Sequence, residues 1–573
     1  MAASNKRGRP GPAITIGIPA VVAAFAGSWG YAYFKDQGGA AKTPDVARRT
    51  TFKVAADPWS GYSTFRKEPR FLAALAKENI DLQYLDEEKY YDQNERLRAL
   101  AAGEIDLALT TLDAFLQFGS KHLENGKFPG AVVFGIDESA GGDAIFLAKG
   151  KKSFDDVTST DKVCFAAGTP SEHLWDFASL SFAALNADLK QDTGVVAKDC
   201  WQKLEQGTVQ IAVLWQPYTA LAVKAGYPKV FATGGQADDL IVDVAVANRS
   251  VLLKQRPALQ DLVNAYFKTI DGYVKDPSAH ANFVTTDCGA DCAGDNALGS
   301  AVLDGIDFLT LEENLCLWFG LCDKPSKLAP RVGKTGRLLV AKGKLDSAAL
   351  PDPESIIDAS FLAALKEEKL ESARLARAVA GPDTQLVEAP PLQAKDQIYA
   401  YTVPGAEGAA VGTLQMPNVA FPEASYMLTE EAQSSVAGIA ETLRSFPALC
   451  VRIVGYTNST GEPQANRTLS KLRALAIGAQ LTRIDPKAFP KERFDVQGLG
   501  AERPILVDGV EDKTASRRTE FTLYTCSGGA ERSPPSPAAA TLPSPAAKPL
   551  PVAKPPTATK PPVSTKLPPP TLK

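Results

Sequence analysis

The chain has 573 residues, with 62 Lys and Arg residues, 66 Asp and Glu residues, and a formal net charge of -4. This length exceeds what one hydrophobic core supports, so we expect two or three domains. The two charge signs are balanced, with none of the basic excess that marks a nucleic-acid-binding face, and we expect no nucleic-acid partner.

The N-terminal region has the pattern of a membrane anchor. Residues 1–12 are basic and residues 13–34 are uncharged and mostly apolar. As a helix, the second segment would reach about 33 Å and cross a bilayer core, with the basic flank left in the cytoplasm. A signal peptide cut after Ala26 is the alternative, although the aromatic residues beyond Ala26 favour an uncleaved anchor. Either way, we expect the remainder of the chain to be exported after a linker at residues 35–50.

Strand-like and helix-like segments alternate over residues 51–380. Residues 52–56 form a strand-like run before the turn sequence 57–62, residues 97–102 are helical, and residues 105–109 form the next strand-like run. This alternation predicts an α/β domain with largely parallel sheets.

Five short motifs occur in order along this region: ADPWSGY from residue 56, RALAAGEID from 98, DESAGGDA from 137, LWQPY from 214 and LIVDV from 240. Together they resemble the nitrate/sulfonate/taurine class of periplasmic substrate-binding proteins. The resemblance implies a two-lobed, type II fold that closes around a ligand. The first lobe would comprise residues 51–140 and 245–380, and the second lobe residues 145–240. Two crossings would join them, near residues 137–145 and 243–248.

The candidate ligand contacts follow strands, because open α/β sheets bind ligands where strands end and helices begin. Helix starts hold oxyanions such as sulfonate, nitrate or carboxylate, whereas aspartates would receive an ammonium, so an anion and an amino-sulfonate-like ligand both stay open. Capping of helices and bracing of hinges are the structural alternatives for these residues. The predicted contacts are Trp59, Ser60, Gly61, Tyr62, Thr110, Thr111, Asp113, Asp143, Thr169, Ser171, Trp215 and Asp243.

Signals for catalysis are sparse. The chain has three histidines, and none has the spacing of a paired metal ligand. His173, beside a predicted helix start, reads as a cap or surface residue rather than a base. We therefore expect a protein that is not an enzyme and that needs no cofactor or metal.

Eight cysteines accompany the predicted export. An even number in an exported chain predicts disulfides. A zinc site made by the middle four is the alternative, but their spacing lacks the C-x2-C pairs of structural zinc sites. The suggested pairs are Cys164 with Cys200, Cys288 with Cys292, Cys316 with Cys322, and Cys450 with Cys526.

A polar loop and a helix follow a strand-like run at residues 449–454. The loop and helix read GYTNSTGEPQANRTLSKLRA from residue 455. Small polar residues before a helix leave backbone amides free for a carboxylate. We expect the helix to begin near Leu469 and to aim the guanidinium of Arg473 back at the loop as a bidentate partner for such a carboxylate.

With GLG at residue 498 and RRTE at residue 517, this pattern resembles the OmpA-like peptidoglycan-binding family over residues 411–527. The resemblance implies an α+β fold that grips the diaminopimelate of the stem peptide with a loop Asp and a helix Arg. Arg473 matches the arginine, but Asn458 stands where the Asp is expected and lacks its charge, so an OmpA-like domain without the ligand is the alternative. The predicted contacts are Thr457, Asn458, Leu469, Arg473 and Arg517.

Residues 381–410 would link the two domains, and the Pro- and Lys-rich residues 528–573 cannot bury a core and should be disordered. These parts predict a single-pass protein of the bacterial inner membrane with most of its chain in the periplasm. We expect a receptor that binds a small polar solute, attaches to peptidoglycan and serves a membrane partner, either an ABC-type permease or a sensor. The alternative is a structural envelope tether whose binding-protein domain is a scaffold for protein interactions.

Overall fold

The computed structural model describes residues 49–368 and 408–526, apart from residues 86, 186–188, 195, 238, 290–291, 293–295, 323 and 422–424. The predicted cytoplasmic segment, anchor and Pro-rich tail, and most of both linkers, lie outside the described residues. Within them, no helix is both long and apolar enough to span a membrane.

The first lobe is built on a mixed sheet of six strands. In sheet order these are β11 (Ile306–Phe308), β4 (Gly130–Ser139), β10 (Val242–Asn248), β3 (Leu107–Thr111), β1 (Thr50–Ala55) and β2 (Ile80–Tyr84). β1 runs parallel to β2 and β3, whereas β10 is antiparallel to its neighbours β3 and β4. β4 is buried except at Glu138 and β10 is buried along its whole length, so both strands are rich in apolar residues.

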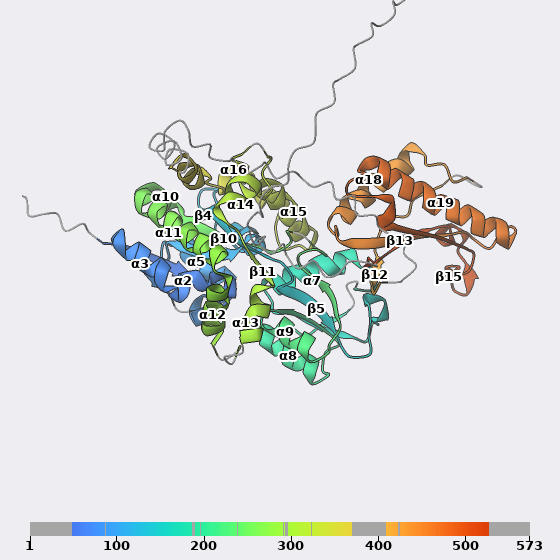
Figure 1. The fold of residues 1–573 in the computed structure, drawn as a ribbon. Helices are drawn as coiled ribbons and strands as arrows, with labels where there is room; N and C mark the ends of the chain where they lie inside the picture. The colour runs from blue at the N-terminus through green and yellow to red at the C-terminus, as the bar shows by residue number, and fades with distance from the viewer. Residues whose placement is uncertain are drawn as a thin grey trace, which may run out of the picture. The chain divides into compact units, whose positions relative to one another are not determined.

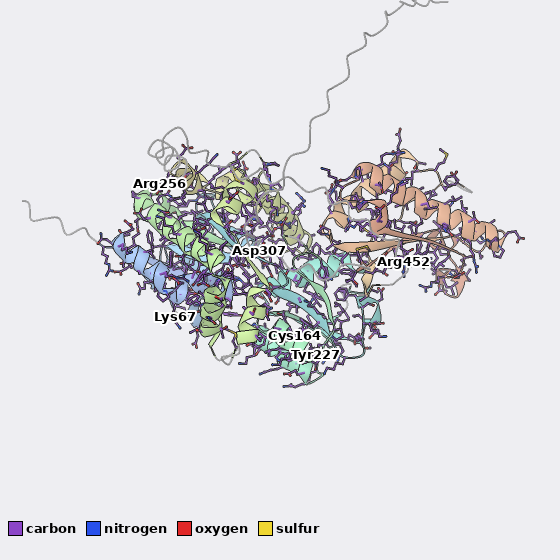
Figure 2. The ribbon with its side chains drawn as sticks, viewed as in Figure 1. Lys67, Cys164, Tyr227, Arg256, Asp307 and Arg452 are labelled. Atoms are coloured by element: carbon purple, nitrogen blue, oxygen red, sulfur yellow. A yellow bond between two sulfur atoms is a disulfide. The ribbon has the colours of Figure 1, made fainter. Side chains whose placement is uncertain are left out.

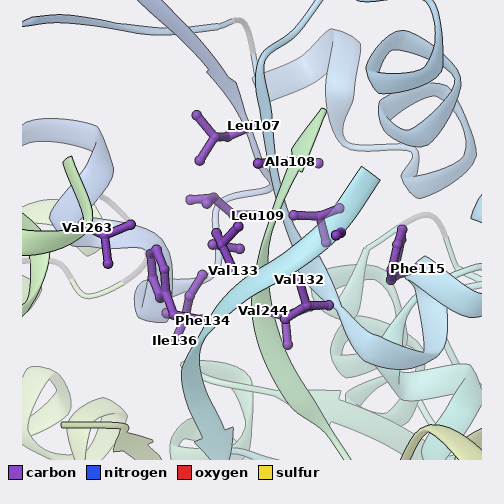
Figure 3. Packing of buried hydrophobic residues seen from close by; sticks show 14 of the residues in the cluster. Leu107, Ala108, Leu109, Phe115, Val132, Val133, Phe134, Ile136, Val244 and Val263 are labelled. Atoms are coloured by element: carbon purple, nitrogen blue, oxygen red, sulfur yellow. The ribbon is translucent and has the colours of Figure 1, made fainter. Parts of the chain in front are cut away.

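Helices pack around this sheet (Figure 1). Figure 3 shows Leu109, Val133 and Val244, from three neighbouring strands, within the apolar core. The helices are α2 (Ser63–Lys67), α3 (Pro69–Lys77), α4 (Glu87–Tyr90), α5 (Gln93–Ala101), α6 (Leu112–Gly119), α10 (Arg249–Lys254), α11 (Arg256–Lys275), α12 (Pro277–Cys288), α13 (Asn296–Leu303), α14 (Leu311–Glu313), α15 (Leu328–Ala341) and α16 (Pro353–Ile356). Short 3-10 or π segments are η1 (Ser60–Tyr62), η2 (Ser120–His122), η6 (Asn314–Trp318) and η7 (Ser347–Ala349).

The second lobe has a five-stranded mixed sheet. In sheet order its strands are β7 (Lys190–Gln191), β6 (Lys162–Cys164), β8 (Ile211–Trp215), β5 (Asp143–Leu147) and β9 (Lys229–Ala232). Its helices are α7 (Pro170–Ser181), α8 (Ala197–Glu205) and α9 (Tyr218–Lys224), with 3-10 segments η3 (Phe154–Asp156) and η4 (Ala183–Leu185). Alternate residues of β5 join different clusters: Ile145 packs with the α7 cluster and Phe146 with the cluster that contains α8 and α9 residues. Helices therefore cover both faces of this sheet.

Two connections cross between the sheets. β4 leads into β5 through residues 140–142, and β9 leads back into β10 through residues 233–241. A strand that re-enters the first sheet where β4 left it must run opposite to β4, so β10 is antiparallel and the sheets are mixed rather than largely parallel. Residues 243–248, where we expected the second crossing, lie inside β10, because an uninterrupted apolar run does not mark where a chain changes sheets.

The C-terminal domain has a four-stranded sheet with helices α18 (Glu430–Arg444) and α19 (Pro463–Ile484). In sheet order the strands are β12 (Ala410–Leu414), β17 (Thr519–Thr525), β13 (Leu449–Tyr456) and β14 (Phe494–Gly500). Shorter elements are η8 (Lys491–Arg493), β15 (Leu506–Val507), β16 (Val510–Glu511) and α20 (Lys513–Ser516). Helix α19 begins before the predicted Leu469, because Pro463 is well suited to the first helical position.

The structure contains the four suggested disulfides: Cys164 with Cys200, Cys288 with Cys292, Cys316 with Cys322, and Cys450 with Cys526. Figure 2 draws the side chains and labels Cys164 in the second lobe. The four-cysteine zinc site is not formed, since those thiols are joined to one another. Among the described residues, no cluster of three or more His, Cys, Asp or Glu side chains could hold a metal ion.

Candidate functional site

A pocket lies between the two lobes, beside both crossings. Trp59 and Tyr62 contribute to its wall from the first lobe, and Trp215, at the end of β8, contributes from the second. Its lining comprises Asp57, Trp59, Tyr62, Tyr91, Thr111, Asp143, Thr169, Pro170, Trp215, Ile241 and Asp243. Strand ends and the turns after them supply most of this lining, as the topology of open α/β sheets favours.

Seven of the twelve predicted ligand contacts line this pocket, and five do not. Ser60 lines a second, outer hollow that adjoins the pocket. Gly61 is buried against Asp137, whose Oδ2 would lie 2.0 Å from a Cβ at this position. A glycine is therefore needed at this position for close packing.

Thr110 and Thr111 point to opposite sides of β3, as successive strand residues do. The Thr110 hydroxyl donates to Oε1 of Gln93 at 2.6 Å and leaves only Thr111 on the pocket side. Asp113 and Ser171 are buried in the first turns of α6 and α7 and are not among the lining residues.

Two buried arginines hold the turn that carries Trp59, and sequence analysis missed both. The Arg96 guanidinium, fully buried, lies 3.1 Å from Oδ2 of Asp57 and also donates to backbone carbonyls. Arg66 donates to the carbonyl of Trp59 at 2.9 Å and pairs with the buried carboxylate of Asp287. These contacts fix the position of the pocket wall before any ligand enters.

Two aspartates of the hinge region face each other across neighbouring strands. Asp137 on β4 and Asp243 on β10 are register partners, and both are buried. The hydroxyl of Tyr62 donates to Asp243. Burial raises the pKa of both aspartates, and the neighbouring Asp137 carboxyl raises that of Asp243 further. Two carboxylates so close in a buried site cannot both ionise readily.

Asp143, the first residue of β5, is the third buried carboxyl of the hinge. Its Oδ2 accepts a hydrogen bond from the Ser139 hydroxyl at 2.6 Å, and that hydroxyl also lies 2.8 Å from Oγ1 of Thr233. Burial raises the pKa of Asp143 to about 7; the Ser139 hydrogen bond lowers it, and the charges of Asp113 and Asp57 raise it.

His173 is not the cap or surface residue that the sequence suggested. It is 2% exposed, and neither ring nitrogen has a hydrogen-bond partner among the described residues. Burial lowers the pKa of His173 and favours the neutral ring. The first turns of α7 are buried on nearly all sides, with Ser171 and Leu174 fully covered, and this burial cannot be inferred from a local cap pattern.

In the C-terminal domain, the predicted wall-binding loop connects β13 to α19. Thr457 is buried, its amide donates to the carbonyl of Gly500 at 2.8 Å, and its hydroxyl has no partner among the described residues. The side-chain oxygen of Asn458 accepts from the Thr460 amide at 3.3 Å. Asn466 on α19 donates to the Thr460 carbonyl at 3.0 Å. The loop is thus held in shape by its own polar groups.

Arg473 lies in the third turn of α19 and is 5% exposed. Its Nε donates to the carbonyl of Ser425 at 2.9 Å, and the guanidinium lies 5.2 Å from the ring centroid of Phe421. Burial, and then the charge of Arg517, lower the pKa of Arg473. Leu469, one turn earlier, is half-buried. Two guanidinium groups within electrostatic reach of each other favour a bound carboxylate.

Comparisons with known proteins match this C-terminal architecture. Residues 420–518 match the model of the OmpA family. The chain is 35% identical over 112 residues to the "Probable lipoprotein YiaD" of Escherichia coli (strain K12), which covers 19% of this chain and 50% of that protein. It is 27% identical over 113 residues to "Outer membrane protein Omp38" of Acinetobacter baumannii, which covers 20% of this chain and 31% of that protein. The chain therefore spans half or less of the length of these relatives.

Among solved structures, the alkanesulfonate-binding protein SsuA from Xanthomonas axonopodis pv. citri, bound to MOPS, is similar over 55% of this chain and 100% of that chain. The sequence identity is 13% and the TM-score 0.42, so the likeness concerns the fold alone. The two lobes and two crossings are those observed directly in the sheets described above. Residues 420–518 thus match the OmpA family, and a two-lobed α/β region with two crossings precedes them.

Proposed function

We propose that this protein is an envelope receptor that captures a small polar solute between its lobes and holds peptidoglycan through its C-terminal domain. The pocket carries this proposal, because residues of both lobes line it, together with Asp143 and Ile241 beside the two crossings. A solute in that position contacts both lobes only when they are closed. It therefore binds the closed arrangement more tightly and shifts the population toward closure.

The wall-binding half of the proposal depends on the loop after β13 and on α19. Arg473 and Arg517 would receive a carboxylate of diaminopimelate, and the loop would receive the remainder of the zwitterion. Asn458 offers an amide oxygen to the ammonium, which is a weaker partner than a carboxylate. We therefore expect binding to peptidoglycan of modest affinity.

An uncleaved anchor at residues 13–34 would fix the N-terminal end in the inner membrane, with the binding domain in the periplasm. A receptor held at both the membrane and the wall cannot shuttle far. This favours a role in sensing, or in local delivery to a membrane permease.

Solute capture is tested with the full-length chain, which is expressed for export and examined by native mass spectrometry before and after denaturation. A small molecule of defined mass that is released on denaturation supports a receptor. A true ligand at a hundredfold excess over its Kd should also stabilise the domain by about 2.7 kcal/mol. A chain that releases no solute, and that no anion, amino-sulfonate or amino acid stabilises, would instead favour the structural tether.

Wall attachment is tested by cosedimentation with purified peptidoglycan sacculi. Arg517→Gln and Arg473→Gln should abolish or strongly reduce sedimentation, because they remove the guanidinium groups. Arg467→Gln is the matched control: Arg467 lies on the same helix but is exposed and pairs with Glu502 at 2.8 Å. Equal sedimentation of all three variants and the unmodified chain would contradict this half of the proposal.

A further inference from the structure

We propose that the captured solute carries a cationic group, an ammonium or a related N–H-bearing cation, and that Asp143 and Asp243 receive it. This inference rests on the proposed solute-binding function and narrows its ligand class. It separates two readings that the sequence left open, since an anion and an ammonium were both compatible with the same turns.

The charge of the pocket lining is the first argument. Three carboxyls, those of Asp57, Asp143 and Asp243, line the pocket, and none of its lining residues is a lysine, arginine or histidine. Asp57 is neutralised by Arg96 at 3.1 Å. Among the described residues, neither Asp143 nor Asp243 forms an ion pair. A cationic solute would stabilise the ionised form of either carboxyl, which burial in the empty pocket disfavours, whereas an anion would disfavour that form further.

The helix starts beside the pocket are the second argument, because they are where an oxyanion would bind. At the α7 start, a carboxylate of the chain itself already accepts a backbone hydrogen bond: Oε2 of Glu172 accepts from the Gly168 amide at 2.7 Å. The α6 start carries the buried Asp113 in its first turn. A sulfonate at either start would be repelled by a carboxylate that interacts favourably with the same helix end.

The walls of the pocket suit a cation. Trp59, Tyr62, Tyr91 and Trp215 line it, and aromatic rings attract ammonium and guanidinium groups. The hydroxyl of Thr111 is buried, lines the pocket and has no hydrogen-bond partner among the described residues. It can accept a hydrogen bond from an N–H donor of the solute, or donate one to an acceptor, so it suits a polar solute of either charge.

Basic side chains occur outside this pocket, in the outer hollow. Lys67, labelled in Figure 2, lines that hollow together with Arg66 and Lys198. Arg66 pairs with Asp287. The two hollows share Asp57, Trp59, Tyr91 and Trp215. The cationic group of a solute therefore belongs in the inner pocket, and any anionic group of the same molecule would point outward.

The test compares two ions with the same propyl chain and opposite charge, propylammonium (as the chloride) and propane-1-sulfonate (as the sodium salt), with sodium chloride at equal ionic strength as the reference. The full-length chain is first stripped of bound solute, and its melting is followed by tryptophan fluorescence. We expect propylammonium to raise the melting temperature and propanesulfonate to leave it unchanged. Asp143→Asn should weaken propylammonium binding by about tenfold or more, and Asp304→Asn, at an exposed aspartate of the same domain, should not.

Asp243→Asn provides a second variant should Asp143→Asn fail to fold. Stabilisation by propanesulfonate but not by propylammonium overturns the inference and leaves the proposed function intact. If neither ion stabilises the chain, the solute released on denaturation decides: a cationic species supports the inference and an anionic species overturns it. The absence of any released solute, together with no stabilisation by any anion, amino-sulfonate or amino acid, would overturn the proposed function together with the inference.

Discussion

Replacing Asp143 by asparagine should flatten the dependence of stability on pH in the solute-free protein. Burial raises the pKa of Asp143 to about 7, with Asp113 and Asp57 adding to the rise and the Ser139 hydrogen bond opposing it. The folded state therefore holds this proton more tightly than the unfolded state does. Stability due to the neutral carboxyl is fully present below the unfolded pKa and is lost as the pH rises through the folded pKa.

The size of the effect follows from the two pKa values of Asp143, an ordinary 3.8 when unfolded and about 7 when folded. Each pKa unit corresponds to about 1.36 kcal/mol, so the total loss approaches about 4 kcal/mol, of which about 2 to 3 kcal/mol falls between pH 5 and pH 8. Asparagine has the shape of the neutral carboxyl and does not titrate. The Asp143→Asn variant should therefore lose about 2 to 3 kcal/mol less than the unmodified chain over this interval.

Urea unfolding followed by tryptophan emission measures this difference. Five of the six tryptophans lie within residues 51–380 and none within residues 411–527, so the signal reports the binding domain. Asp304→Asn should keep the pH dependence of the unmodified chain, because that aspartate is exposed. Parallel curves for Asp143→Asn and the unmodified chain would show that Asp143 is ionised in the empty pocket, and the argument from burial would be refuted.

Three further substitutions test other parts of the structure. Gly455→Ala should destabilise the C-terminal domain by roughly 1–3 kcal/mol, because the added Cβ would lie 2.1 Å from the Ser470 carbonyl oxygen. Gly438→Ala is the control and should not destabilise it, because its Cβ would meet nothing within 4 Å. Melting followed by circular dichroism checks both variants. Arg96→Met should cost the binding domain roughly 3–5 kcal/mol by leaving Asp57 unpaired. Arg98→Met removes only the exposed ion pairs with Glu95 and Glu104 and should cost much less. Equal losses in urea unfolding would refute this. Asn458→Asp should raise affinity for sacculi about fivefold by restoring a charged partner for the ammonium, and an unchanged cosedimentation isotherm would count against the proposed wall site.

The features that could be predicted from sequence are those encoded locally. The loop from Gly455 to Arg473 is one continuous stretch, so its small polar residues, its helix and its arginine all appear in a single motif. Two of the cysteine pairs join close neighbours in the chain, one joins β6 to α8 and one joins β13 to the end of β17, and the suggested pairing matches the disulfides in the structure. The alternation of strands and helices likewise predicts the α/β fold, because each element buries its own apolar pattern.

Burial of single polar residues could not be predicted in the same way. Arg96 and Arg98 lie two positions apart on α5, but Arg96 is fully buried against Asp57 and the side chain of Arg98 is 38% exposed. Their local sequences do not distinguish them. The distinction comes from the turn at Asp57, which follows β1 and lies against Arg96 in the folded chain. The burial of His173 likewise depends on tertiary packing that its local sequence does not show.

The charge of the pocket is the most consequential feature that long-range pairing determines. Asp137 and Asp243 face each other only because β10 returns antiparallel to β4 in one particular register. A slip of one residue would turn the Asp243 side chain to the other face of the sheet. The sequence placed both Asp143 and Asp243 near the crossings, but it also offered helix starts for an anion. It could not show that Glu172 accepts a hydrogen bond at the α7 start or that Asp113 is buried in the first turn of α6. Since carboxyl groups of the chain lie at both helix starts and the hinge carboxyls have no ion-pair partner among the described residues, the physical argument favours a cation.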